Sequence, residues 1–234
     1  MIKIEAMTVQ FGGVRPLDAL DGQFKAPICG LIGPNGAGKT TLLNVLSGFV
    51  TPVKGAAYLD DVALRSLSPT RRVAAGLRRT FQQELVVDEL TARENIQAIA
   101  DHISPRRDAE DEVERALAFV ELRPRANVLG HSLNLYERRM IEIGKTLIGR
   151  PKAILLDEPG AGLNDTETDR LRRLLLQIPE RFGAQLILID HDADLIASVC
   201  IETMVLDFGK LLAFGPTRAV LDDPVVRRAY LGTA

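Results

Sequence analysis

One segment constrains the fold of this chain more than any other, the octapeptide GPNGAGKT at positions 33–40. It matches the pattern G-x-x-x-x-G-K-[ST] in full, follows the apolar run Ile28–Ile32 and precedes a helical pattern that begins near Thr40. In this context glycines allow backbone N–H groups to surround phosphate oxygens, and the start of the helix adds partial positive charge. The segment therefore predicts a strand, a phosphate-binding loop and a helix, in that order.

The side chains of this loop have separate expected roles. Lys39 is expected to reach the β- and γ-phosphates of a nucleotide, and the Thr40 hydroxyl to bind Mg²⁺. The Asn-Lys-x-Asp sequence with which P-loop GTPases read guanine is absent, so a GTPase is the least favoured reading. The predicted ligands are a nucleoside triphosphate and Mg²⁺, and the residues expected to bind the nucleotide here are Asn35, Gly36, Gly38, Lys39, Thr40 and Thr41.

Two further apolar runs end in polar side chains. The run at 153–156 is followed by Asp157 and Glu158, and the run at 186–189 by Asp190 and His191. We expect Asp157 to bind Mg²⁺, usually through water, and Glu158 to orient or deprotonate the attacking water. Because ligands of open α/β sheets collect at the carboxyl ends of strands, His191 is expected to lie near the γ-phosphate.

The order of the patterns predicts the fold class. Apolar runs at 28–32, 153–156, 186–189 and 204–206 predict buried strands, and helical patterns lie at 40–46, 138–148 and 166–178. They predict an α/β fold, a P-loop NTPase core with a mostly parallel sheet. The segments 2–11 and 55–59 favour a small antiparallel β layer. We expect a single ATPase domain over 1–234, with its α/β core in 1–87 and 151–234 and an inserted helical subdomain in 88–150.

Composition narrows the kind of partner. The chain is 46% hydrophobic and 26% charged, with 29 Lys and Arg against 31 Asp and Glu, a net charge of −2. This balance argues against nucleic acid as a partner. The N-terminus lacks the apolar stretch of a signal peptide, and no apolar run approaches the length of a membrane span. Two cysteines without C-x-x-C spacing make a disulfide framework or zinc site improbable. Because no apolar run is long enough to span the bilayer, a membrane role would require another chain that does so.

The phosphate loop is followed by TFQ at 80–82, a helical segment, LLDEP at 155–159 and a histidine after the next strand. In this order the motifs resemble the ATP-binding subunit of ABC transporters over essentially the whole chain. Four further stretches are similar to the branched-chain amino-acid importers, or the related urea and amide importers: FGGV at 11–14, RTFQ at 79–82, AGLN at 161–164 and DP at 223–224 with AYLG at 229–232.

The resemblance implies further roles. Phe11 would stack on adenine, and Gln82 would sense Mg²⁺ and the attacking water as both a catalytic residue and a metal ligand. The expected partners are membrane permease subunits, which dock near Gln82, a second ATP-binding subunit and, indirectly, a solute-binding protein outside the membrane. The chain would lie peripherally on the cytoplasmic face of the cell membrane, and the loop 161–164 would cross to the opposite ATP-binding subunit.

One motif departs from the family pattern Leu-Ser-x-Gly-Gln. The equivalent positions 133–137 read LNLYE, with Asn134 for serine, Tyr136 for glycine and Glu137 for glutamine. We expect the Tyr136 ring to enter the space where this motif meets the γ-phosphate bound by the partner subunit. We expect the Glu137 carboxylate to repel that phosphate. A second reading is that Asn134 and Glu137 form a helix-capping pair. The departure favours an asymmetric pair with a different ATP-binding subunit, while a homodimer stays possible.

The resemblance predicts an ATPase that energises an importer of amino acids or related small solutes. Two alternatives stay open. The altered signature is compatible with an ATP-binding regulatory subunit that hydrolyses little ATP. The second alternative is a soluble ABC ATPase that is not part of a transporter. Such proteins usually carry tandem cassettes or long extensions, for which 234 residues leave no room.

Overall fold

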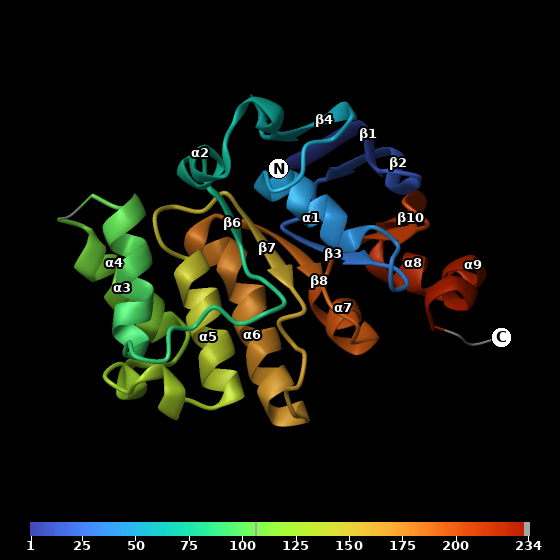
Figure 1. Cartoon of the computed structure of the whole chain (residues 1–234). Helices are drawn as coiled ribbons and strands as arrows, with labels where there is room; N and C mark the ends of the chain where they lie inside the picture. Colours follow the sequence, from blue (N-terminus) through green and yellow to red (C-terminus); the bar gives the residue numbers. More distant parts are fainter. Residues whose placement is uncertain (106, 232–234) are drawn as a thin grey trace.

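The computed structural model describes residues 1–105 and 107–231, so Gly232 of the C-terminal motif lies outside the described residues. Figure 1 shows a sheet in the middle of the molecule, with helices below it and a second, smaller sheet above. The strands are β1 (Ile2–Phe11), β2 (Val14–Phe24), β3 (Ile28–Ile32), β4 (Lys54–Leu59), β5 (Val62–Ala63), β6 (Leu77–Arg79), β7 (Ala153–Asp157), β8 (Gln185–Ile189), β9 (Glu202–Asp207) and β10 (Lys210–Pro216).

The helical elements follow the expected patterns and add several that the sequence reading did not name. The α-helices are α1 (Lys39–Ser47), α2 (Pro69–Ala74), α3 (Ala92–Ile103), α4 (Ala109–Phe119), α5 (Leu135–Thr146), α6 (Asp165–Phe182), α7 (Ala193–Val199), α8 (Thr217–Asp222) and α9 (Pro224–Val226). Short helical turns are η1 (Leu64–Ser66), η2 (Arg123–Arg125), η3 (Gly130–Ser132) and η4 (Arg227–Leu231).

The larger sheet has the order β10-β9-β3-β8-β7-β6, in which β9 to β6 are parallel and only β10 is antiparallel to its neighbour. The smaller sheet has the order β2-β1-β4-β5 and is antiparallel throughout. The α/β prediction, with a mostly parallel sheet and an antiparallel layer, is confirmed. The edge strand β6 was missed because its three residues, two of them arginines, carry no strand pattern.

Alternate residues of the parallel strands belong to two separate cores. Leu31, Leu155 and Ile187 face the small sheet and pack with α1, so this helix lies between the sheets. Ile32, Leu156 and Leu188 face the other side and pack with α5, α6 and α7. Because both faces are covered, the strands read as continuous apolar runs. The helices α3, α4 and α5 all lie within 88–150 and share this second core (Figure 1).

Parallel strands point their carboxyl ends toward one edge of the sheet. The residues that follow β3, β6, β7 and β8 therefore gather there: the loop at 33–38, Gln82, Glu158 and His191. Within the described part of the chain, no helix is both long and apolar enough to cross a membrane. Cys29 and Cys200 are both buried and form no disulfide.

Candidate functional site

The loop at 33–38 joins β3 to α1 in a conformation that depends on glycine. Gly38 has φ +106°, and a Cβ atom at this position would collide with the carbonyl oxygen of Pro16. The side chain of Lys39 folds back over the loop, and its Nζ donates to the carbonyl oxygens of Gly33 (2.6 Å) and Pro34 (3.0 Å). Lys39 is 7% exposed. Its ammonium group is thus aligned along the inside of the loop, at the start of α1.

Charge around Lys39 brings the predicted site residues into one environment. Burial lowers the pKa of Lys39, while the nearby carboxylates of Glu158 and Asp157 oppose this shift. The cost of desolvation is larger than the attraction to the two carboxylates, which is why the net shift of the Lys39 pKa is downward. The geometry therefore places a positive group on the loop opposite acidic groups from the end of β7.

Three predicted residues converge on one carboxylate. Nε2 of Gln82 donates to Oε2 of Glu158 at 3.1 Å, and Nε2 of His191 lies 3.0 Å from Oε1 of the same carboxylate. Glu158 is thus bound on both oxygens, by side chains that follow two other strands, β6 and β8. His191 is 49% exposed, so the cluster opens to solvent on that side.

The backbone holds Glu158 in an uncommon conformation. Its φ is +53°, a left-handed value that costs a non-glycine residue of order 1 kcal/mol. The N–H of Glu158 donates to the carbonyl oxygen of Ile189 (2.8 Å), and that of Gly160 to the carboxylate of Asp190 (2.9 Å). These bonds tie the segment after β7 to the end of β8, and they direct Glu158 toward His191.

Asp157, the predicted magnesium ligand, has a side-chain partner that the sequence did not reveal. Its Oδ2 accepts a hydrogen bond from Nη2 of Arg79 at 3.1 Å, and Arg79 and Asp157 are 6% and 3% exposed. Burial raises the pKa of Asp157, and the bond from Arg79 opposes this shift. The carboxylate is therefore fixed in place by an arginine from the neighbouring strand.

The oxygen atoms at this edge fit a magnesium ion that also contacts phosphate. Thr40, an exposed residue, provides a hydroxyl, and the Asp157 carboxylate and Gln82 amide provide further oxygens. Among the described residues no group of three His, Cys, Asp or Glu side chains could hold a metal alone. Mg²⁺ typically takes one or two protein carboxylates, with phosphates and water supplying the other ligands, so this donor set suits it.

The remaining predicted nucleotide residues lie on the surface around the loop. Asn35, Gly36 and Thr40 are exposed, and Thr41 is partly buried. Phe11 ends β1, pairs with Val14 across a tight turn and is 55% exposed. The same hairpin reaches the loop through Pro16, which packs against Gly38. An exposed ring on this hairpin is thus available for stacking.

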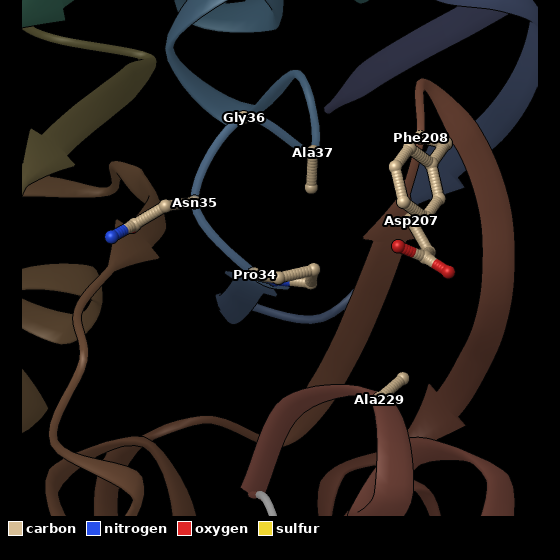
Figure 2. A pocket seen from close by; sticks show the side chains of 7 residues that line it. All are labelled: Pro34, Asn35, Gly36, Ala37, Asp207, Phe208 and Ala229. Atoms are coloured by element: carbon tan, nitrogen blue, oxygen red, sulfur yellow. The ribbon is translucent and has the colours of Figure 1, made fainter.

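A cavity of about 260 Å³ lies on another side of the loop (Figure 2). It is lined by Pro34, Asn35, Gly36, Ala37, Asp207, Phe208 and Ala229. Figure 2 shows the Asn35 side chain pointing away from Asp207 and Phe208. Of the predicted nucleotide residues, Asn35 and Gly36 line this cavity, whereas Lys39, Thr40 and Phe11 do not.

The structure corrects one expectation about the altered signature at 133–137. The Tyr136 ring does not enter exposed space, because it is 8% exposed and belongs to the core shared by α4, α5 and α6. Helical side chains lean toward the N-terminus, so the burial of this ring reflects the face of α5 that packs against α4 and α6 and not its place in the first turn. The capping reading fits, since Asn134 and Glu137 form a complete capping box at the start of α5.

Sequence reasoning missed Arg79, Asp190 and Tyr230. The hydroxyl of Tyr230 donates to the carbonyl oxygen of Asp190 (3.1 Å), which ties the C-terminal segment to the residue before His191. Asp190 is 5% exposed and was passed over as a strand end. Arg79 stood in a motif used only for the resemblance. Its signal was its place three residues before Gln82, the expected joint between core and helical segment, but without β6 nothing placed it beside β7.

Comparison with known proteins shows the family to which this chain belongs. Residues 23–161 match the ABC transporter family. The chain belongs to the ABC transporter family. It is an ATP-binding subunit and an ATPase of this type, since its matched core carries the phosphate loop and the carboxylates after β7.

Full-length relatives of this ABC ATPase are transport proteins. It is 32% identical over 252 residues to BraF of Pseudomonas aeruginosa and to LivG of Escherichia coli, both high-affinity branched-chain amino acid transport ATP-binding proteins, with 100% of this chain and 98% of each relative covered. It is 33% identical over 207 residues to LptB of Acidithiobacillus ferridurans, a lipopolysaccharide export ATP-binding protein, with 88% and 85% covered.

Solved structures agree with the fold. The ADP conformation of MJ1267, an ATP-binding cassette of an ABC transporter, is 27% identical, with a TM-score of 0.87 over 100% of this chain and 99% of that one. A nucleotide-free ATP-binding cassette from an ABC transporter gives the same values. The resemblance to ABC transporter ATP-binding subunits that the motifs indicated is confirmed, and so is the predicted fold.

Proposed function

We propose that this ABC ATPase hydrolyses ATP at the edge formed by β3, β6, β7 and β8, with Glu158 as the base. The observation that carries the proposal is that Gln82 and His191 bind the two oxygens of the Glu158 carboxylate. A carboxylate oriented on both sides can take a proton from an attacking water with little reorganisation. His191 and Gln82 are the other catalytic residues in this proposal.

The nucleotide would be bound by residues on three elements. Backbone N–H groups of the loop at 33–38 and the ammonium group of Lys39 would bind phosphates, and Phe11 would stack on the base. Thr40, Gln82 and Asp157 are the proposed ligands of Mg²⁺, which neutralises phosphate charge when bound. The remaining proposed contacts are Asn35, Gly36, Gly38 and Thr41.

A single substitution tests the role of Glu158. Glu158→Gln keeps the size of the side chain and its acceptor oxygen but removes the charge that takes the proton. We expect release of phosphate to fall by a factor of about 10² to 10⁴, with ATP affinity retained. Glu180→Gln, on the exposed face of α6, is the control and should keep full turnover. Undiminished hydrolysis by Glu158→Gln would reject the assignment of the base.

We infer import of amino acids or related small solutes as the transport function. The support is coverage: the branched-chain amino acid relatives match over 100% of this chain, and the lipopolysaccharide export relative over 88%. The chain would act on the cytoplasmic face of the membrane, bound to permease subunits, with a solute-binding protein as an indirect partner. Reconstitution with candidate permeases should give ATP hydrolysis that rises with added amino acid. Stimulation only by lipopolysaccharide would favour the export function.

A pair of aromatic rings supports a docking surface for the permease. Phe49, just beyond α1, and Phe81, just before Gln82, stack edge to face with centroids 5.8 Å apart. Phe49 is 60% exposed, and Leu85, in the segment after Gln82, is 51% exposed. Contiguous exposed apolar surface marks sites of protein interaction. We propose that an amphipathic cytoplasmic helix of the permease covers them, beside the catalytic glutamine.

The start of α5 supports pairing with a different ATP-binding subunit. Its capping box uses the N–H of Glu137 and the N–H of Asn134 internally, at 2.8 and 3.0 Å. Glu137 also pairs with Arg125 and brings a carboxylate to the helix start. Fewer free N–H groups and an added negative charge weaken this helix end as a phosphate site. The partner would supply an intact signature to the loop of this chain.

Mixing tests the asymmetric pair. The isolated chain should hydrolyse ATP slowly, and addition of the partner subunit should raise turnover strongly. Brisk hydrolysis by the isolated chain as a homodimer would contradict the asymmetric arrangement. ATP binding without turnover in either state would instead favour a regulatory subunit.

A further inference from the structure

Arg79 is a buried cation at the centre of the candidate site. It ends β6, and its backbone lies in parallel register with Leu155 of β7, two residues before Asp157. From this position its Nη2 reaches Oδ2 of Asp157 at 3.1 Å. No other side-chain hydrogen bond to this carboxylate is found in the described residues, so Arg79 alone fixes its orientation from the side.

The guanidinium of Arg79 is itself immobilised by two other elements. Its Nη1 donates to Oδ1 of Asn44 on α1 at 2.7 Å. Its Cζ lies 4.8 Å from the centre of the ring of Phe81, which is in the segment after β6. An arginine fork held by a carboxylate, an amide and an aromatic face has little freedom to rotate. The orientation that it imposes on Asp157 is therefore rigid.

The neighbouring arginine shows that burial alone does not explain this arrangement. Arg78 is also buried, but it donates only to backbone carbonyl oxygens. Those of Ile148 and Gly149, at the end of the helical segment, lie 3.0 and 3.1 Å from its Nη2. Arg78 thus joins two parts of the backbone, whereas Arg79 is directed at the carboxylate proposed to bind metal.

We propose that Arg79 is a positioning residue for the magnesium site, which holds Asp157 by Oδ2 and leaves Oδ1 for the ion or its water. The inference rests on the function proposed above, in which Asp157 is a ligand of Mg²⁺. Carboxylate ligands of metals are commonly oriented by hydrogen bonds from residues that do not touch the metal, and loss of such a partner typically costs 10- to 100-fold in metal affinity. Arg79 supplies that bond here.

The experiment measures metal binding rather than turnover. Calorimetric titration of ADP into the purified chain, once with excess Mg²⁺ and once with EDTA, gives the factor by which Mg²⁺ strengthens nucleotide binding. Arg79→Met should reduce this factor by about 10- to 100-fold and leave ADP binding in EDTA unchanged. If the wild-type factor is itself below about 10, the factor of the variant should fall to unity. Thermal unfolding and circular dichroism report whether the variant is folded.

Two further variants keep the test decisive. Arg78→Met is the matched control, and should lower thermal stability while the Mg²⁺ factor stays at the wild-type value. Asn44→Ala leaves Arg79 and Asp157 in place but removes a support of the guanidinium, so a smaller loss in the same direction is expected. Asn44→Ala also provides the test if Arg79→Met does not fold.

Two results would overturn the inference. One is a wild-type Mg²⁺ factor in folded Arg79→Met or, if that variant does not fold, in Asn44→Ala. The other is a larger factor in Arg79→Met, because Arg79 would then compete with the ion for Asp157 instead of positioning it. If Mg²⁺ had no effect on the wild-type chain, the proposed metal site itself would be contradicted, and the inference with it.

Discussion

Nε2 of His191 lies 3.0 Å from Oε1 of Glu158, although the residues are 33 positions apart in the chain. Each follows a strand of the parallel sheet, β8 for His191 and β7 for Glu158, and these strands are direct neighbours. The contact therefore follows from strand order, and it joins the proposed base to a group that can donate or accept a proton.

His191 should affect turnover more than nucleotide binding. In His191→Ala the Glu158 carboxylate loses one of its two side-chain partners, so we expect kcat to fall by roughly a hundredfold or more, with little change in KM for ATP. Phosphate release under steady state measures both values. His102→Ala, an exposed position on α3, is the control. A wild-type kcat in His191→Ala would remove the histidine from the proposed mechanism.

Tyr136 is expected to act on stability and not on catalysis. Tyr136→Gly moves position 136 back toward the family pattern, but it empties a core site and adds a helix-interior glycine, so the free energy of unfolding should fall by about 3–5 kcal/mol. Turnover of the isolated chain should not rise. Urea denaturation and phosphate release are the measurements. Leu135→Ala, at a residue 38% exposed, should stay within about 0.5 kcal/mol of wild type. A stable Tyr136→Gly protein with raised turnover would contradict the buried-ring explanation.

Arg138 should stabilise the link between α5 and the segment after Gln82. Its Nε donates to Glu84 at 2.8 Å, and its Nη1 donates to Asp88 at 2.7 Å and to the carbonyl oxygen of Gly130 at 2.8 Å. The Arg138 and Glu84 side chains are partly shielded from water, so Arg138→Ala should lower the free energy of unfolding by about 1–3 kcal/mol. Chemical denaturation measures this loss. Arg172→Ala, which breaks an exposed pair with Asp169, should change it by less than about 1 kcal/mol. Equal losses in the two variants would show that the Arg138 network adds nothing beyond a surface pair.

Tyr230 predicts a loss of stability at alkaline pH. Burial, reinforced by the Asp190 carboxylate, raises the pKa of Tyr230 from 10.0 to about 12. The folded chain therefore keeps a phenol proton that the unfolded chain releases, and this part of the stability is lost as pH rises from about 10 toward 12. Absorbance at the tyrosinate band and denaturation at several alkaline pH values measure the effect. Tyr230→Phe should show a shallower decline, and an identical decline in both proteins would contradict the shift.

The predicted elements and the predicted site differ in how they were reached. The strands that carry Asp157 and His191 were found because both faces of the sheet are covered, which makes their sequences continuously apolar. The loop at 33–40 was found by the spacing of its glycines, and the structure shows the reason for Gly38, where a Cβ would collide with the carbonyl oxygen of Pro16. The capping box of α5 was read as one of two alternatives from the three-residue spacing of Asn134 and Glu137, and the structure contains it.

Contacts between distant side chains could not be read in the same way. The ion pair of Arg79 with Asp157 depends on β6 lying next to β7, and β6 is too short and too charged to show a pattern. The direction of the Tyr136 ring depends on which face of α5 meets α4 and α6, and the family pattern alone suggested the opposite direction.

The amino-acid sequence by itself determined the phosphate loop, the buried parallel strands and the polar residues that end them, because each depends on local backbone geometry or on burial of a short segment. The tertiary structure alone decided that Arg79 orients Asp157, that Tyr230 contacts Asp190 and that Tyr136 is part of the core. The physical reason is that these contacts depend on strand order and helix packing, which no short stretch of sequence encodes.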